Sequence, residues 1–119
     1  MVLDDPQSTI LDRGGYICLA MADNKIVGTA ALMKEHGNEY ELAKMAVTAE
    51  YRGKGISKLL MNTCIKIAEE KKWHRLYLYS NTLLVPAIQL YRRYEFKEIP
   101  VGPDSHYNRT NIKMELKLY

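Results

Sequence analysis

Cysteine is scarce in the 119-residue sequence, which contains only Cys18 and Cys64. Both lie in apolar surroundings, and neither has a second cysteine at the CxxC spacing of metal and redox motifs. This pattern is typical of buried, reduced thiols in a cytoplasmic protein, and it does not predict a disulfide framework.

Long hydrophobic runs and a strong charge imbalance are also missing. No apolar run approaches the roughly 20 residues of a membrane span, and nothing resembles a signal peptide. The net charge is only +3, and the basic residues are scattered without aromatic residues placed for base stacking. We therefore expect neither a membrane segment nor nucleic-acid binding.

Internal repeats, low-complexity segments and linkers are absent as well, so residues 1–119 are expected to form one domain. Hydrophobic residues make up 47% of the chain and charged residues 26%. These proportions are typical of a soluble globular protein, and a chain of this length has enough apolar surface for a single core.

Hydrophobic periodicity predicts an α/β domain in the order β-β-β-α-β-α-β-β, with a mixed, mostly antiparallel central sheet and flanking helices. Residues 1–13 are expected to form an opening segment with at most a short helical turn. Asn81-Thr82 is expected to cap the second helix, which has Pro86 in its first turn. The expected strands are 16–22, 26–33, 40–47, 75–80, 96–100 and 111–119, and the expected helices run from 56 to about 72 and from 85 to 94.

Glycines and basic residues crowd the start of the first helix, in the segment VTAEYRGKGISKLLM (47–61). A helix start leaves backbone N–H groups unpaired at the partly positive end of the helix dipole, and glycine lets a ligand approach the backbone. With Arg52 and Lys54, these features suit a phosphate or pyrophosphate. The alternative is a tight turn with solvated charges. The Walker motif is absent because Thr48 replaces its first glycine, and a dinucleotide fingerprint fails at Lys58.

The same loop resembles the acetyl-CoA pyrophosphate loop of the GNAT superfamily of N-acetyltransferases, whose pattern is Gln/Arg-x-x-Gly-x-Gly/Ala. Arg52, Gly55 and Ser57 occupy the defined positions, and Ser57 is a small residue whose hydroxyl can itself bond a phosphate. The resemblance extends over about residues 14–119. It includes AIQLYRRYEF (87–96), which is similar to the family's Ala-x-x-Leu-Tyr-x-x-x-Gly-Phe signature, with Glu95 in place of the glycine.

The resemblance implies a GNAT-like acyl-CoA N-acyltransferase fold and an acetyl-CoA-dependent N-acetyltransferase. The acetyl group would pass directly from acetyl-CoA to a primary amine of a small molecule, an amino acid or a peptide, with no metal and no acetyl-enzyme. A non-catalytic module that binds or senses acyl-CoA is the alternative function.

Two catalytic residues are implied by the resemblance. An alkylamine with a pKa of roughly 10.4 needs a base before it can attack, and a leaving thiolate, whose thiol has a pKa near 8.5, benefits from an acid. Glu41 stands where several GNAT enzymes have a general base, and strand alternation places it on one face with Ala43, Met45 and Val47. Tyr91 stands where the family has the general acid. A solvated strand carboxylate and an ordinary tyrosine are the alternatives, and the fallback bases are Glu35, His36 and Glu39.

Cofactor contacts are also implied by the resemblance. The end of the third strand is expected to splay from the next strand, so that the pantetheine arm inserts like a short extra strand. Arg93 is equally well explained as a phosphate contact or as part of a solvated helix face, and the loop 101–110 is expected to select the acceptor. The expected cofactor-binding residues are Met45, Ala46, Val47, Arg52, Gly53, Lys54, Gly55, Ile56, Ser57 and Asn81.

The N-terminal region departs from the family pattern. A GNAT domain usually begins with a strand and two helices before the first hairpin, whereas about 13 residues precede Gly14 here. The acceptor side is therefore expected to be incomplete, whether the chain is a shortened protein, a fragment, or a protein that completes its site with a partner. The strand 16–22 is expected to expose a sheet edge, which favours association, and a homodimer is one form that this edge allows.

Overall fold

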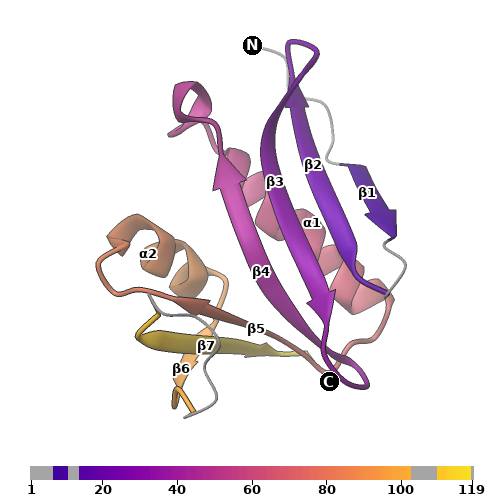
Figure 1. Cartoon of the computed structure of the whole chain (residues 1–119), viewed down its shortest axis with the longest axis vertical. Coiled ribbons are helices and arrows are strands. Elements are labelled where there is room, and N and C mark those ends of the chain that lie inside the picture. Colours follow the sequence, from indigo (N-terminus) through magenta and orange to yellow (C-terminus); the bar gives the residue numbers. More distant parts are fainter. Residues whose placement is uncertain (1–6, 11–13, 103–109, 119) are drawn as a thin grey trace.

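A computed structural model describes residues 7–10, 14–102 and 110–118. One seven-stranded sheet has the strand order β1-β2-β3-β4-β5-β7-β6 (Figure 1). The strands are β1 (Gln7–Ile10), β2 (Tyr16–Ala22), β3 (Lys25–Lys34), β4 (Glu39–Val47), β5 (Arg75–Ser80), β6 (Lys97–Ile99) and β7 (Ile112–Lys117). The helices are η1 (Ala49–Tyr51, 3₁₀), α1 (Ile56–Glu70) and α2 (Val85–Arg93).

The predicted α/β class and mixed sheet are confirmed. Among the described strands, β4 and β5 pair in parallel, and all other neighbours pair antiparallel. No helix among the described residues is long and apolar enough to cross a membrane.

The prediction for the N-terminal segment is wrong. Residues 7–10 form β1, which pairs with β2 so that Gln7 lies opposite Leu19 and Ile10 opposite Tyr16. The predicted open edge at 16–22 is therefore covered. A strand of four residues is too short to show a period of two, and its pairing depends on a neighbour rather than on local sequence.

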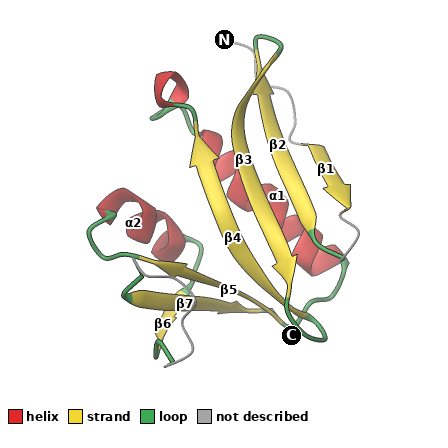
Figure 2. Cartoon of the chain, viewed as in Figure 1, coloured by secondary structure: helices red, strands yellow, loops and turns green. Residues whose placement is uncertain are grey.

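The core lies on one face of the sheet, where α1 packs across β2, β3 and β4 (Figures 1 and 2). Cys18 and Cys64 are buried and free, as the sequence predicts. Gly28 of β3 lets the start of α1 lie close to the sheet, since a Cβ there would stand 2.8 Å from Cγ2 of Ile56 and 3.0 Å from Cδ1 of Leu60. This close packing fixes the position of the turn that precedes α1.

The strands β4 and β5 separate soon after they pair. Their register covers only Glu39 to Glu41 on β4 and Arg75 to Tyr77 on β5. Figure 1 shows the two strands close together near the C-terminal label and far apart at the level of α2. From Leu42 onward, the edge of β4 that faces β5 pairs with no described strand, and the splay implied by the family resemblance is present.

A bulge in β4 changes which residues share a face. Leu32 lies opposite Leu42 while Ala31 lies opposite Lys44, so Ala43 is an extra residue in the strand. Met45 therefore faces the core, while Glu41 faces the opposite side of the sheet. The prediction that Glu41 shares a face with Met45 and Val47 is wrong, because the bulge interrupts the period-two alternation on which it was based.

The start of α2 also differs from its prediction. Leu84 is the N-cap and provides no side-chain capping bond. The Oδ1 atom of Asn81 instead accepts a hydrogen bond from the backbone N–H of Leu83 at 2.9 Å, while the N–H of Leu84 donates to the Asn81 carbonyl oxygen at 2.9 Å. Asn81 thus shapes the turn before the helix rather than capping it.

Glu95, after the end of α2, has a positive φ of 70°. A non-glycine residue in this region costs about 1–2 kcal/mol, and glycine would recover that strain at an unfolded-state entropy cost of roughly 0.4–1 kcal/mol. We expect Glu95→Gly to raise the free energy of unfolding by about 0.5–1 kcal/mol, measured by urea denaturation. Glu95→Ala keeps the Cβ and should not stabilise the protein. An equal gain from both substitutions would contradict the strain at Glu95.

Candidate functional site

A cleft of about 840 Å³ opens between the end of β4, the start of α1 and one face of α2. Its walls include Arg52, Gly53, Gly55, Ile56 and Ser57 of the predicted loop. The end of β4 contributes another wall through Met45, Ala46 and Val47. The structure therefore gathers nearly all of the predicted cofactor-binding residues around one space.

The loop before α1 is built on two left-handed glycines. Gly53 has a φ of 76° and Gly55 a φ of 81°, conformations that residues with a Cβ avoid. Gly55 is the N-cap of α1 and no side chain caps the helix. The backbone N–H groups of the first turn are therefore available to a ligand rather than to a side chain.

The charged residues along the cleft are all basic. Among the described residues, Arg52, Lys58 and Arg93 line it, and no carboxylate does. The Nε atom of Arg52 donates a hydrogen bond to the Val47 carbonyl oxygen at 3.2 Å, which ties the loop to the end of β4. The partly positive N-terminal end of α1 adds to the positive charge of these side chains, so the cleft mouth is suited to an anion.

Tyr51 fixes the segment between β4 and the loop. Its hydroxyl donates a 2.7 Å hydrogen bond to Oδ2 of Asp23, in the turn between β2 and β3. Because Tyr51 also lines the cleft, this bond connects one wall of the cleft to the sheet.

Tyr91 lines the cleft from α2. Its ring is half-buried and packs at a tilt against Phe96, with the ring centroids 6.0 Å apart. Burial raises the pKa of the Tyr91 hydroxyl above its usual value. The hydroxyl therefore stays protonated at neutral and moderately alkaline pH.

Two of the predicted cofactor residues do not line the cleft. Lys54 is exposed at the tip of the loop, and Asn81 lies in the turn before α2. Asn81 thus affects the cleft through the position of α2, which contributes Leu84, Pro86, Ala87, Leu90, Tyr91 and Arg93 to it.

Glu41 lies at the apex of the splayed strands. It is only 5% exposed and is the last residue of β4 in register with β5, opposite Tyr77. It does not line the cleft, because it faces the opposite side of the sheet. The pKa of Tyr77 is raised, first by burial and then by the nearby carboxylates of Glu35 and Glu41.

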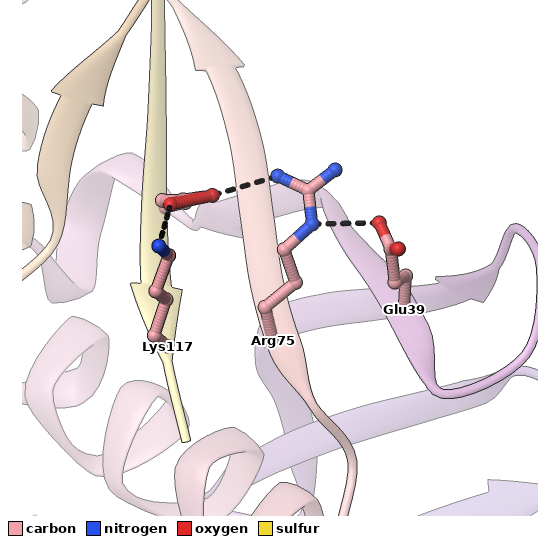
Figure 3. Close-up of polar contacts among 4 residues, drawn as sticks. Glu39, Arg75 and Lys117 are labelled. Carbon is pink, nitrogen blue, oxygen red and sulfur yellow. Dashed lines mark hydrogen bonds and ion pairs between the residues drawn. The ribbon is translucent and has the colours of Figure 1, made fainter. Parts of the chain in front are cut away.

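Two of the fallback bases, Glu39 and His36, are placed less favourably than Glu41. The carboxylate of Glu39 accepts a 2.6 Å hydrogen bond from Nε of Arg75, whose NH1 group donates to Oε2 of Glu115 at 2.8 Å (Figure 3). His36 is exposed in the turn after β3. The structure places Glu41 at the point where the strands part, and the carboxylate of the third fallback base, Glu35, also lies near Tyr77.

Sequence reasoning missed the apolar wall on α2. Leu84, Ala87, Leu90 and Tyr91 recur at three- and four-residue intervals and line the cleft together. The helical period predicts that such residues share a face. Counting three and four residues back from Tyr91 in the sequence would have identified this face of α2. Part of the predicted acceptor loop, residues 103–109, lies outside the described residues.

Residues 2–96 match the sequence model of the acetyltransferase (GNAT) family. The chain is 33% identical over 99 residues to N-acetylaspartate synthetase of Xenopus tropicalis, with 82% of this chain and 36% of that protein covered. It is 32% identical over 104 residues to the Homo sapiens protein of that name, covering 87% of this chain and 34% of that protein. The chain thus spans about a third of the length of these curated relatives.

Solved structures have the same fold. A GNAT acetyltransferase from Staphylococcus aureus Mu50 superposes with a TM-score of 0.81 at 26% identity, covering 91% of this chain and 71% of that chain. The PaiA N-acetyltransferase from Thermoplasma acidophilum, in complex with coenzyme A, has a TM-score of 0.73 at 25% identity, covering 86% and 60%. Because the family match runs from before β1 to the end of α2, the chain belongs to the GNAT family of acetyltransferases.

Proposed function

We propose that the chain is an acetyl-CoA-dependent N-acetyltransferase that transfers an acetyl group to a primary amine of a small molecule, an amino acid or a peptide. The observation that carries this proposal is the cleft, whose basic, glycine-built mouth lies beside the end of β4, where that strand no longer pairs with β5. The relatives named N-acetylaspartate synthetase are named for an acetylated amino acid, which supports an amine acceptor.

In this proposal the pyrophosphate of CoA binds the turn from Arg52 to Ser57. The backbone N–H groups at the start of α1 donate to it, and Arg52, Lys58 and Arg93 supply positive charge. The pantetheine arm follows the unpaired edge of β4. The same edge offers backbone donors to the thioester oxygen as it gains negative charge.

The two proposed catalytic groups approach the thioester from different sides. Tyr91 lines the cleft on the face that carries the helices, and it gives a proton to the departing thiolate. Glu41 lies on the opposite face, where the strands part, and it takes a proton from the amine directly or through a water molecule. The acceptor therefore enters from the face opposite the cofactor.

A thiol-release assay with acetyl-CoA and a panel of primary amines tests this proposal. Amine-dependent release of CoA above the hydrolysis background, with the acetylated product identified by mass, is the expected result. Acetyl-CoA binding without transfer to any amine would contradict the enzyme and favour the sensing module.

Arg52→Ala is expected to weaken acetyl-CoA binding by about 10- to 100-fold, because a charge-assisted hydrogen bond contributes roughly 1.5–3 kcal/mol. Lys54→Ala is the matched control, since this neighbouring cation lies outside the cleft wall. The dissociation constant of acetyl-CoA from Lys54→Ala, measured by calorimetry, should differ from the wild-type value by less than about 3-fold. A loss of turnover in Arg52→Ala with unchanged acetyl-CoA affinity would contradict the pyrophosphate contact.

A further inference from the structure

The sheet face opposite the helices carries a lysine held against two tyrosine rings. Lys113 of β7 lies opposite Tyr79 of β5. Its Nζ atom stands 4.9 Å from the Tyr77 ring centroid and 5.2 Å from that of Tyr79. The two rings meet edge to face with their centroids 6.0 Å apart. These contacts hold the ammonium group in one place on this face.

Most other charges around Tyr77 are already paired within the protein. Arg75 binds the carboxylates of Glu39 and Glu115, and Lys117 approaches Glu115 at 3.8 Å (Figure 3). These four residues balance one another. Among the described residues, Lys113 forms no such ion pair, although it is only partly exposed. The ammonium group of a partly exposed lysine that has no carboxylate partner in the described part of the chain is suited to an anion from solution.

Lys113 lies on the same face as Glu41. Glu41 and Tyr77 are partners in the register of β4 and β5, so their side chains project to the same side, and Lys113 sits over the Tyr77 ring. The nearby carboxylates of Glu35 and Glu41 are both close enough to act on Tyr77. This face therefore presents negative charge beside β4 and a positive group beside β5 and β7.

We propose that Lys113 binds a carboxylate of the acceptor while the amine of the same molecule faces Glu41. The acceptor class is then an amine that also carries a carboxylate, such as an amino acid. A diamine would bring a second ammonium group against Lys113 and is disfavoured. This inference rests on the proposed transferase function, and it adds Lys113 as the residue that selects the acceptor.

The test uses matched acceptors, namely α-, β- and γ-amino acids and the carboxamide of each. For at least one distance between amine and carboxylate, the wild-type chain should have a kcat/KM about 10- to 100-fold higher for the acid than for the amide. Lys113→Gln should reduce that ratio to about 1. Lys117→Gln removes the same charge from the same face of β7 and should keep the wild-type ratio.

The acid-to-amide ratio separates recognition from packing. If Lys113 only braces the tyrosine rings, Lys113→Gln lowers the unfolding temperature and leaves the ratio unchanged, which overturns the proposal. Lys113→Arg keeps the charge and should retain most of the preference for the acid. A wild-type chain without such a preference overturns the proposal as well.

Calorimetric titration of the same acids and amides into the CoA complex gives a readout that does not need turnover. Acids that bind the wild-type complex but not the Lys113→Gln complex support the carboxylate site, even if no acetyl transfer occurs. In that case only the transferase proposal is contradicted. Acids that bind both proteins equally, or neither up to about 10 mM, overturn the carboxylate site.

Discussion

Tyr91→Phe is expected to lower kcat for acetyl transfer by about 100-fold or more, with little change in acetyl-CoA affinity. A positioned general acid typically contributes 10²- to 10⁴-fold, and the half-buried ring should keep its place against Phe96 without the hydroxyl. Because burial raises the pKa of Tyr91, deprotonation of this group should reduce the wild-type kcat only above the usual tyrosine pKa of about 10.

Tyr94→Phe is the matched control for this prediction. It removes a hydroxyl just beyond the end of α2, where Tyr94 donates to Oδ1 of Asn62 at 2.7 Å and does not line the cleft. Its kcat should change by less than about 3-fold, since the hydroxyl contacts only Asn62 and, at 3.2 Å, the backbone carbonyl oxygen of Lys58, so that only contacts within the fold are lost. Steady-state kinetics at saturating acetyl-CoA gives both values. An unchanged kcat in Tyr91→Phe, or equal losses in the two variants, would contradict the acid role.

Glu41→Gln is expected to lower kcat/KM for the amine by about 100-fold or more at neutral pH. The amine, with a pKa of roughly 10.4, is then almost fully protonated and has lost its base. Each unit of higher pH increases the free amine about 10-fold, so the defect should shrink as the pH approaches 10. The profile of kcat/KM against pH for the variant and the wild type measures this convergence.

Glu39→Gln serves as the control for the base, because Glu39 lies two residues away on the same strand face and is paired with Arg75. We expect it to leave the pH profile unchanged. A Glu41→Gln defect that stays constant with pH would indicate that Glu41 stabilises the structure rather than taking a proton. An unchanged rate in Glu41→Gln would transfer the base role to another group.

The features that local sequence determines were predicted well. The strands at Tyr16–Ala22 and Arg75–Ser80 have the predicted bounds. The first is enclosed by turn residues, and the second is a short run of alternating Leu and Tyr between Arg75 and Ser80. The loop from Arg52 to Ser57 carries its own signal, since its glycines are needed for positive φ angles. Residues close together in the sequence therefore predicted one wall of the cleft.

The features that depend on distant pairing were not predicted. The strand β1 exists through its register with β2, and the bulge at Ala43 appears only when β4 is aligned with β3. The bulge decides the face of Glu41, and therefore places the proposed base on the side of the sheet opposite the cleft. In the sequence, Lys113 looks like an ordinary strand lysine, and its contacts with the rings of Tyr77 and Tyr79 follow only from the pairing of β7 with β5. Nothing local marks such a residue as functional.

Calorimetric titration of acetyl-CoA into the chain tests the central claim most directly. The cleft at the start of α1 predicts one binding site, with an affinity in the range of about 1–100 µM and at least about 10-fold weaker binding of pantetheine, which lacks the pyrophosphate. Absence of binding up to about 1 mM acetyl-CoA, or equal affinities for acetyl-CoA and pantetheine, would contradict a pyrophosphate site in the glycine turn.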